Sequence, residues 1–313
     1  MSHSKLSVII PVYGVEKYIE KCAVSLFSQT LSDIEYIFVN DCTPDNSMGV
    51  LNHVISKFPE RENYIKIINH DVNKGLPAAR KTGILAATGE YIIHCDSDDW
   101  VSEDLYEKLY LKITANNADV AVCDIIQVGD CEHYKKIKGS CGSNFEVFMN
   151  DVIRMKVTWS LVNKLFRRSL YSDEIIYPTD YMGEDMALCL QLLTACDKFC
   201  YIEDAHYFYL ANFSSESRKE DKESIVKLYD MFAKNYNIVI NHFRKSGLYN
   251  KYINDLLYTC FKCKMIFVMR ARSLSIVKHN IGILPITSLS VVKDRSLSLF
   301  TRLQAFFFYL LKL

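Results

Sequence analysis

Short apolar runs alternate with stretches of helical periodicity over about the first 125 residues. The apolar runs, which predict buried strands, are 6–10, 34–39, 64–68, 91–95 and 120–126. Apolar positions at helical spacing lie between these runs and predict helices. Strands that are apolar on both faces and alternate with helices are typical of a mainly parallel sheet covered on both sides. The pattern therefore predicts an α/β fold.

The pattern is mixed beyond residue 126. Residues 127–143 predict a loop or hairpin, and the runs 157–166, 199–202 and 207–210 predict short strands. Residues 212–217 predict a polar loop. Helices are predicted over 186–195, 220–244 and 250–270, the last two being long. We therefore expect one domain over residues 1–215 and a helical region over 216–313.

The segment 295–313 predicts a helix with two unlike faces. Its polar stripe holds Ser298, Thr301, Arg302, Ala305, Tyr309 and Lys312, and its apolar face holds Leu297, Phe300, Leu303, Phe306, Phe307, Leu310 and Leu311. Residues 270–313 contain seven basic residues and one acid. A basic, amphipathic helix is typical of peripheral contact with a membrane surface. The alternative is a terminal helix packed on its own domain or on a second subunit.

Composition excludes several classes of protein. The 313 residues include 37 basic and 37 acidic side chains, so the net charge is zero and we expect no nucleic-acid partner. No run reaches the ~18 apolar residues of a membrane-spanning helix. The 11 cysteines are irregularly spaced and the N-terminus has no signal-like apolar region, which favours a cytoplasmic location with reduced thiols. The pair Cys260 and Cys263 is interpreted as packing within a helix.

Carboxylates are concentrated where the fourth predicted strand ends. Asp96, Asp98 and Asp99 lie within four residues. Acids so close repel one another, and a hard divalent cation with oxygen ligands would relieve the repulsion. The alternative is a solvated turn after a strand. Two other strands also end in polar or aromatic residues, at 11–13 and 40–41, and ligands bind at this edge of open α/β sheets.

Six segments in order resemble the motifs of inverting nucleotide-sugar glycosyltransferases of family 2. They are 7–14, 25–30, 35–45, 73–80, 89–100 and 183–185. The resemblance covers about the first 215 residues. It implies a Rossmann-like GT-A fold with a mainly parallel central sheet flanked by helices and a helical C-terminal extension. It also implies a nucleotide-binding half over 1–126 and an acceptor half over 127–215.

The resemblance assigns roles to particular residues. Asp185 would be the general base, and Asp98 would hold Mn²⁺ or Mg²⁺. The donor-binding residues would be Pro11, Tyr13, Asp41, Arg80, Asp96 and Ser97. Asn40, Cys42 and Lys81 depart from the residues usual in the family. The Gln-x-x-Arg-Trp motif of processive synthases is absent, which favours the addition of one sugar per encounter.

The resemblance implies a nucleotide-sugar donor, with a UDP-sugar expected, and a glycan or lipid-linked glycan acceptor of the bacterial surface-polysaccharide type. The enzyme would lie in the cytoplasm, with 295–313 against the inner face of the membrane. The oligomeric state stays open. Rival interpretations are a non-catalytic nucleotide-sugar-binding protein and a phosphatase that uses Asp-x-Asp. A dinucleotide-binding dehydrogenase is disfavoured because 11–14 contains no Gly-x-Gly-x-x-Gly.

Overall fold

The computed structural model describes residues 4–129, 134–140, 142, 144–211, 221–278, 284, 285, 287 and 289–313. It contains two compact units. The first comprises 1–148, 160–179 and 195–212, and the second comprises 149–159, 180–194 and 213–313. The second unit thus includes two segments from before residue 215. The predicted domain boundary at 215/216 and the predicted loop 212–217 both lie outside the described residues. The boundary therefore stays a prediction.

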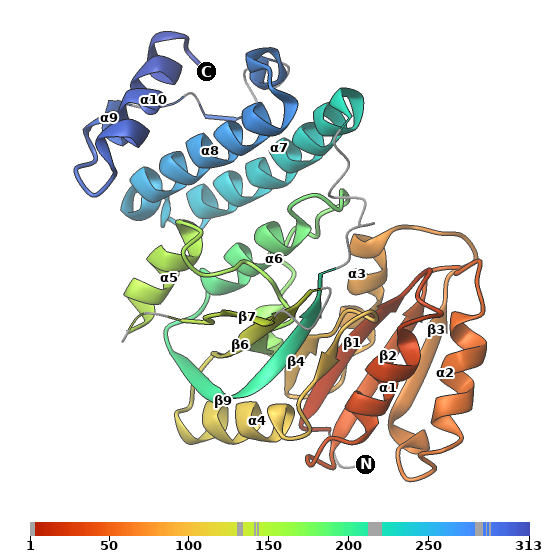
Figure 1. Cartoon of the computed structure of the whole chain (residues 1–313). Coiled ribbons are helices and arrows are strands. Elements are labelled where there is room, and N and C mark those ends of the chain that lie inside the picture. The colour runs from red at the N-terminus through yellow and green to blue at the C-terminus, as the bar shows by residue number, and fades with distance from the viewer. Residues whose placement is uncertain are drawn as a thin grey trace. The chain divides into compact units, whose positions relative to one another are not determined.

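The first unit is built on a mixed but mostly parallel sheet, as predicted (Figure 1). The strand order in the described residues is β3-β2-β1-β4-β8-β6-β9-β5, with β7 paired to β6. Four neighbouring strands are mutually parallel: β1 (Leu6–Val12), β2 (Ile34–Asn40), β3 (Ile65–Asn69) and β4 (Tyr91–His94). The others are β5 (Trp100–Val101), β6 (Val120–Val128), β7 (Tyr134–Ile137), β8 (Lys164–Arg167) and β9 (Phe199–Leu210).

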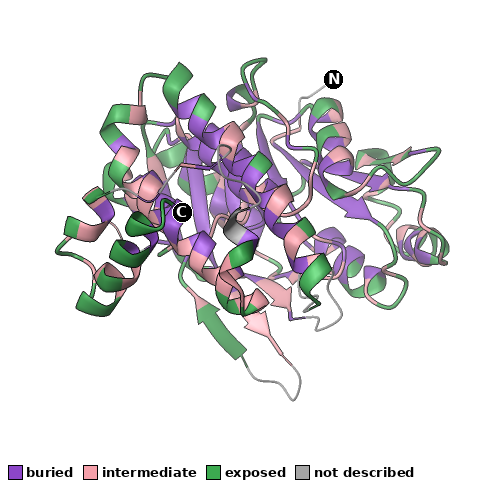
Figure 2. Ribbon diagram, turned by 90° about the horizontal axis from the view of Figure 1, so that it is seen from above, coloured by how far each residue is buried: buried purple, intermediate pink, exposed green. Residues whose placement is uncertain are grey.

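Helices cover both faces of this sheet. They are α1 (Ile19–Phe27), α2 (Ser47–Ile55), α3 (Leu76–Ala86) and α4 (Leu105–Ala115). Side chains alternate along β1, so Val8 and Ile10 share a buried cluster with α1, α2 and α4. Ile9 points to the other face, against Gly83 of α3, where an added Cβ would lie 2.4 Å from Ile9. Strands β1 and β4 are buried along their whole length, and β2 is buried up to its last residue (Figure 2).

The region from 127 to 210 differs in part from the prediction. The expected hairpin over 127–143 is confirmed by antiparallel pairing of β6 and β7. The predicted strand 157–166 was wrong over most of its length, because only its end forms β8. The two short strands expected at 199–202 and 207–210 are one strand, β9. Pairing with β6 is interrupted at residues 202–205, which include Glu203 and Asp204, and resumes at His206 opposite Asp124 after a register shift.

The second unit consists of helices. They include α6 (Glu184–Leu193), α7 (Lys222–Lys245), α8 (Tyr249–Ala271), α9 (Leu289–Lys293) and α10 (Leu299–Leu310), while α5 (Phe145–Ile153) lies at the boundary between the units. Short 3₁₀ turns occur at Glu62–Tyr64, Arg168–Leu170 and Leu274–Lys278. Three aromatic residues of α7, Phe232, Tyr236 and Phe243, are buried. No described helix has the length and apolar character needed to cross a membrane.

The cysteines in the described part of the chain are free thiols, and all of these except Cys42 are buried. Cys260 and Cys263 lie in α8, where Cys260 donates to the carbonyl of Pro285 and Cys263 contacts the sulfur of Met155. Their interpretation as packing residues is therefore confirmed. Cys42 has a φ of 56°, a left-handed conformation that glycine adopts without strain.

Candidate active site

The ends of β1, β2 and β4 lie side by side at one edge of the sheet. The amide of Asp41 donates to the carbonyl of Val12 (3.0 Å), and the amide of Cys95 donates to the carbonyl of Ile9 (3.0 Å). These ladder bonds bring together the segments that carry Pro11, Tyr13, Asp41 and Asp96. Pro11 is buried, whereas Tyr13 is 49% exposed. The three polar strand ends therefore meet as the sequence predicts.

Asp41 fixes the loop before α3. Its carboxylate accepts the amides of Lys74 (2.9 Å) and Gly75 (2.7 Å) and lies 2.7 Å from Nδ1 of His70. These partners use three of the roughly four lone-pair positions of a carboxylate, which leaves one for a ligand N–H. His70 was missed in the sequence, although it directly follows β3 as Asp41 follows β2. Its Nε2 lies 2.9 Å from the hydroxyl of Thr82 on α3.

Arg80 projects from α3 to the end of β4. It is 2% exposed, and its Nη2 lies 2.9 Å from Oδ1 of Asp96. His94, the last residue of β4, is fully buried, and neither of its ring nitrogens has a hydrogen-bond partner in the described structure. Burial, together with the charge of Arg80, holds the pKa of His94 well below its usual value. His94 is therefore neutral at physiological pH.

The carboxylates of the acidic segment after β4 raise one another's pKa values. Burial and the charge of Asp96 raise the pKa of Asp98 to about 6. Burial and the charges of Asp98 and Asp96 raise the pKa of Asp99 well above its usual value. Asp99 accepts hydrogen bonds from the Tyr207 hydroxyl (2.6 Å) and the Leu210 amide (2.8 Å). Three carboxylates therefore lie close together in a partly buried segment, where positive charge would make them easier to ionise.

Tyr207 organises this segment and was not predicted as a site residue. Its hydroxyl donates to Asp99 and accepts the backbone amide of Asp96 (3.0 Å), so β9 supports the acidic loop from below the sheet edge. The only sequence signal was an aromatic residue in an apolar run, which is equally typical of core. Ser97 is buried in the same loop.

The donor set at this edge fits a divalent cation that retains open positions. Asp96 and Asp98 offer hard oxygen ligands, and their mutual repulsion would be relieved by positive charge. No group of three or more His, Cys, Asp or Glu side chains in the described residues is arranged to hold a metal. Two carboxylates leave coordination positions for water or phosphate oxygens, which is how Mg²⁺ is usually bound.

Asp185 belongs to the second unit, in the first turn of α6. Gly183 occupies the cap position with a φ of 81°, so Asp185 is the second residue of the helix and not its N-cap. A carboxylate in the first turn is favoured by the helix dipole. Glu184 is 3% exposed, while Asp185 is more accessible.

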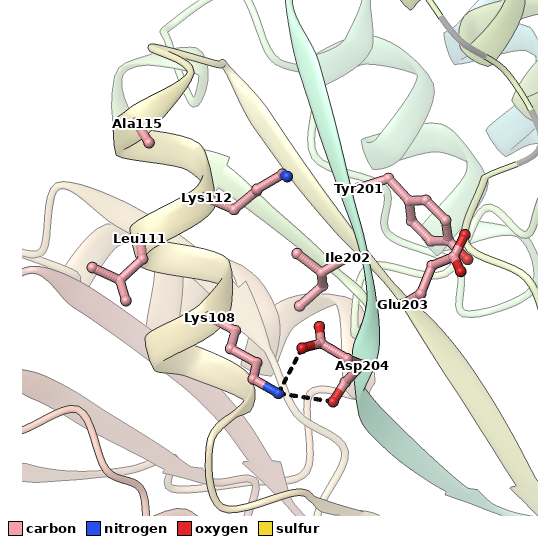
Figure 3. A pocket seen from close by; sticks show the side chains of 8 residues that line it. All are labelled: Lys108, Leu111, Lys112, Ala115, Tyr201, Ile202, Glu203 and Asp204. Atoms are coloured by element: carbon pink, nitrogen blue, oxygen red, sulfur yellow. Dashed lines mark hydrogen bonds and ion pairs between the residues drawn. The ribbon is translucent and has the colours of Figure 1, made fainter.

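A separate pocket of about 420 Å³ lies between α4 and β9 in the first unit (Figure 3). Lys108 at its rim pairs with Asp204 (2.9 Å) and with Asp104 (2.8 Å). None of the predicted site residues lines this pocket. Its charges neutralise one another locally, so it has no net charge for a phosphate.

The chain matches the model of "Glycosyl transferase family 2" over residues 7–175. It is 30% identical to "Uncharacterized glycosyltransferase EpsJ" of Bacillus subtilis over 266 residues, which cover 82% of this chain and 74% of EpsJ. It is 29% identical to "Glycosyltransferase GlyA" of Streptococcus pneumoniae over 248 residues, which cover 76% of this chain. The matched stretch spans only 35% of GlyA.

Solved structures share the fold. Staphylococcus aureus TarS 1–349 in complex with UDP-GlcNAc has a TM-score of 0.59 at 17% identity, covering 97% of this chain and 89% of TarS 1–349. The mannosyltransferase PcManGT of Pyrobaculum calidifontis, in complex with GDP-Man and Mn²⁺, has a TM-score of 0.55 at 14% identity, covering 99% and 88%. The fold and the family match define a glycosyltransferase. The chain belongs to glycosyl transferase family 2.

Proposed function

We propose that this protein transfers a single sugar from a UDP-sugar to a hydroxyl of a glycan or lipid-linked glycan, with inversion at the anomeric carbon. The observation that carries the proposal is the acidic sheet edge, where Asp98 has a pKa raised to about 6 beside Asp96. Such an excess of negative charge suits a cation-bound diphosphate. Family membership and the UDP-GlcNAc and GDP-Man complexes of similar folds support a nucleotide-sugar donor.

The donor would bind at the ends of β1, β2 and β4. Asp41 has one lone-pair position left for an N–H of the base, and the exposed ring of Tyr13 can lie against the base. Pro11 lines the same strand end. Arg80, which pairs with Asp96, would be positioned to contact the diphosphate as well. Ser97 lies between Asp96 and Asp98, the two carboxylates that would face the metal ion.

When bound by Asp98, with Asp96 beside it, Mn²⁺ or Mg²⁺ would neutralise the charge of the departing nucleotide diphosphate. Asp185 would accept the proton of the acceptor hydroxyl as its oxygen attacks the anomeric carbon. Attack opposite the leaving diphosphate gives inversion. The bond to the acceptor oxygen forms as the bond to the diphosphate breaks, and the proton passes to the Asp185 carboxylate.

The C-terminal helix supports peripheral contact with a membrane. Ala305 and Phe308 are buried, and Phe308 packs edge-on against Phe261 of α8 (ring centroids 5.6 Å). The apolar face is left outside. Its exposed side chains are Leu299, Phe300, Leu303, Phe306, Phe307, Leu310 and Leu311. The neighbouring Lys293, Arg295 and Lys312 are exposed and cationic, which suits the anionic inner surface of a membrane and hence a lipid-linked acceptor.

Release of nucleotide from a panel of UDP-glucose, UDP-GlcNAc, UDP-galactose and GDP-mannose, with Mn²⁺ or EDTA, tests the proposal. We expect one UDP-sugar to be turned over and EDTA to stop the release. Asp185→Asn should abolish turnover while the nucleotide still binds in calorimetry. Turnover of that variant at the wild-type rate would refute the role of Asp185, and absence of turnover with all four donors would refute the choice of donor.

A further inference from the structure

The loop that leads into Asp185 is not fixed by α6 itself. Gly183 precedes the helix in a left-handed conformation (φ 81°), and no side chain caps the helix. Residues 180–183 have no regular secondary structure. The direction in which Asp185 points therefore depends on what holds this loop.

Asn235 of α7 holds it through two hydrogen bonds. The side chain is 1% exposed, and its Nδ2 donates to the carbonyls of Asp180 (2.7 Å) and Met182 (3.0 Å). Both amide hydrogens are thus used on the loop. The amide oxygen is buried with no hydrogen-bond partner in the described structure. Leaving a buried polar atom unpaired costs folding free energy. The orientation of the amide is set by the two carbonyls alone.

Neighbouring residues of α7 hold α6 at both of its ends. Phe232, one turn before Asn235, covers Gly183 so closely that an added Cβ would lie 3.2 Å from its ring. The hydroxyl of Thr194, just after α6, lies 2.8 Å from Nε2 of His242. The contacts advance along α6 and α7 in the same direction, so the two helices run side by side. Helix α7 therefore packs along α6, the helix that carries Asp185, and contacts it at both ends.

We propose that Asn235 is a positioning residue for sugar transfer, acting through Asp185. It holds the carbonyls of Asp180 and Met182 and so fixes the angle at which the Asp185 carboxylate leaves the helix. This inference rests on the proposed role of Asp185 as base. It extends the machinery of the reaction beyond the family match, which ends at residue 175, into a C-terminal helix.

The test compares Asn235→Leu with Tyr236→Phe. Leu has a similar volume but no donor. Tyr236 is the adjacent buried residue, and its hydroxyl donates to the carbonyl of Leu256 on α8 instead of to the loop. Both variants lose buried hydrogen bonding from α7, but only one releases the 180–182 carbonyls. Three quantities are measured. The first is kcat for nucleotide release, with water as acceptor and a saturating amount of the panel donor that is turned over fastest. The others are the Kd for UDP and the hydrogen-exchange rates of the 180–186 backbone amides.

We expect Asn235→Leu to lower kcat about tenfold or more, since small misplacements of a reacting group are costly. The Kd for UDP should stay within about twofold, and exchange of the 180–186 amides should rise. Tyr236→Phe should keep kcat within about twofold at a temperature where both variants are folded. If Asn235→Leu does not fold, Asn235→Ala replaces it with the same expectations.

Three outcomes would overturn the inference. They are a wild-type kcat in the Asn235 variant, a parallel loss of UDP binding, and an equal fall in kcat for Tyr236→Phe. Asp185→Asn in the same assay separates the two proposals. If that variant loses turnover and Asn235→Leu does not, only the positioning role is wrong, whereas wild-type turnover of Asp185→Asn removes the base on which both depend.

Discussion

The guanidinium of Arg80 lies 2.9 Å from the carboxylate of Asp96, and this ion pair joins α3 to the end of β4. The two partners differ in their environment, because the side chain of Arg80 is 3% exposed and that of Asp96 is 32% exposed. An unpaired charge would therefore cost more folding free energy on Arg80, which is buried, than on Asp96, which reaches water. The same pair links the Asp41 loop, where α3 begins, to the acidic segment.

Arg80→Met should lower the free energy of unfolding by about 2 kcal/mol, the low end for a broken buried pair, because Asp96 regains water. Urea denaturation measures this. Arg167→Met is the matched control, since Arg167 pairs with Glu90 (3.5 Å) and Asp119 (3.7 Å) nearer the surface and should cost about 1 kcal/mol or less. Equal losses in the two variants would contradict the importance of the buried pair.

Asp98→Asn should stabilise the protein in EDTA at neutral pH. The folded-state pKa of Asp98 is about 6, above its ordinary value of 3.8. As the pH rises from about 4 to 6, the unfolded chain loses its proton first, so wild-type stability falls. Above pH 6 the loss is constant at about 1–3 kcal/mol, reduced by partial exposure. Denaturation curves at pH 4 and pH 8 should show the variant's advantage only at pH 8.

Asp45→Asn provides a control of opposite sign. Although burial raises the pKa of Asp45, hydrogen bonds from Ser47 and Thr43 outweigh it and lower the pKa to about 2. That carboxylate stabilises the fold above pH 4, and the stabilisation is lost as the pH falls toward 2. Its replacement should therefore destabilise the protein at pH 8. A stabilising effect of Asp45→Asn, or a destabilising one of Asp98→Asn in EDTA, would contradict this electrostatic description.

His94→Phe should raise the free energy of unfolding by about 1 kcal/mol, because two ring nitrogens without partners leave the core. The gain should increase below pH 6.5. There the unfolded chain takes up a proton on His94 that the folded protein does not, which destabilises the wild type only. His70→Phe should instead lower the free energy of unfolding, since both nitrogens of His70 are hydrogen-bonded. Thermal unfolding of both variants at pH 8 measures the sign of each effect, and the same measurement at pH 5.5 tests whether the gain for His94→Phe increases.

The full chain should float with liposomes that contain anionic lipid, whereas a chain ending at Lys293 should not. The apolar face of α10 would supply the insertion and its basic neighbours the charge attraction. Because the truncation also exposes Phe261, the variant Phe300→Ser, Leu303→Ser, Phe307→Ser is the better control, as all three side chains are exposed in the folded protein. Equal partitioning of the full chain and this variant would exclude membrane contact, and formation of a dimer that needs these residues would point to a second copy instead.

The polar strand ends could be predicted from the sequence because parallel strands bring their carboxyl ends to one edge, whatever the loops do. Asp41 and Asp96 lie at that edge for that reason, because each follows a strand of the parallel set. Tyr207 and His70 were missed because an aromatic residue in a strand, or a histidine after one, is equally typical of core and loop. The register of β9 depends on its pairing with β6, which is separated from it by many residues and leaves no local signal.

The amphipathic character of the segment 295–313 could be predicted from the sequence, whereas the residues that anchor α10 to its own unit could not. The hydrophobic pattern predicted an apolar side and a polar side, yet the small Ala305 and the aromatic Phe308 are the residues that anchor the helix. Asn235 likewise had no signal in the sequence. A single polar residue on a long helix is read as solvent-facing until the carbonyls that it meets are known.

The support that α7 gives to the loop at residue 180 bears on how far the chain can be shortened. A version that ends at residue 215, the domain boundary that the sequence predicts, would keep Asp185 but discard Phe232 and Asn235 along with the helix that bears them. Such a fragment could retain a nucleotide pocket and still be inert toward acceptors. The minimal working enzyme should therefore extend at least through residue 245.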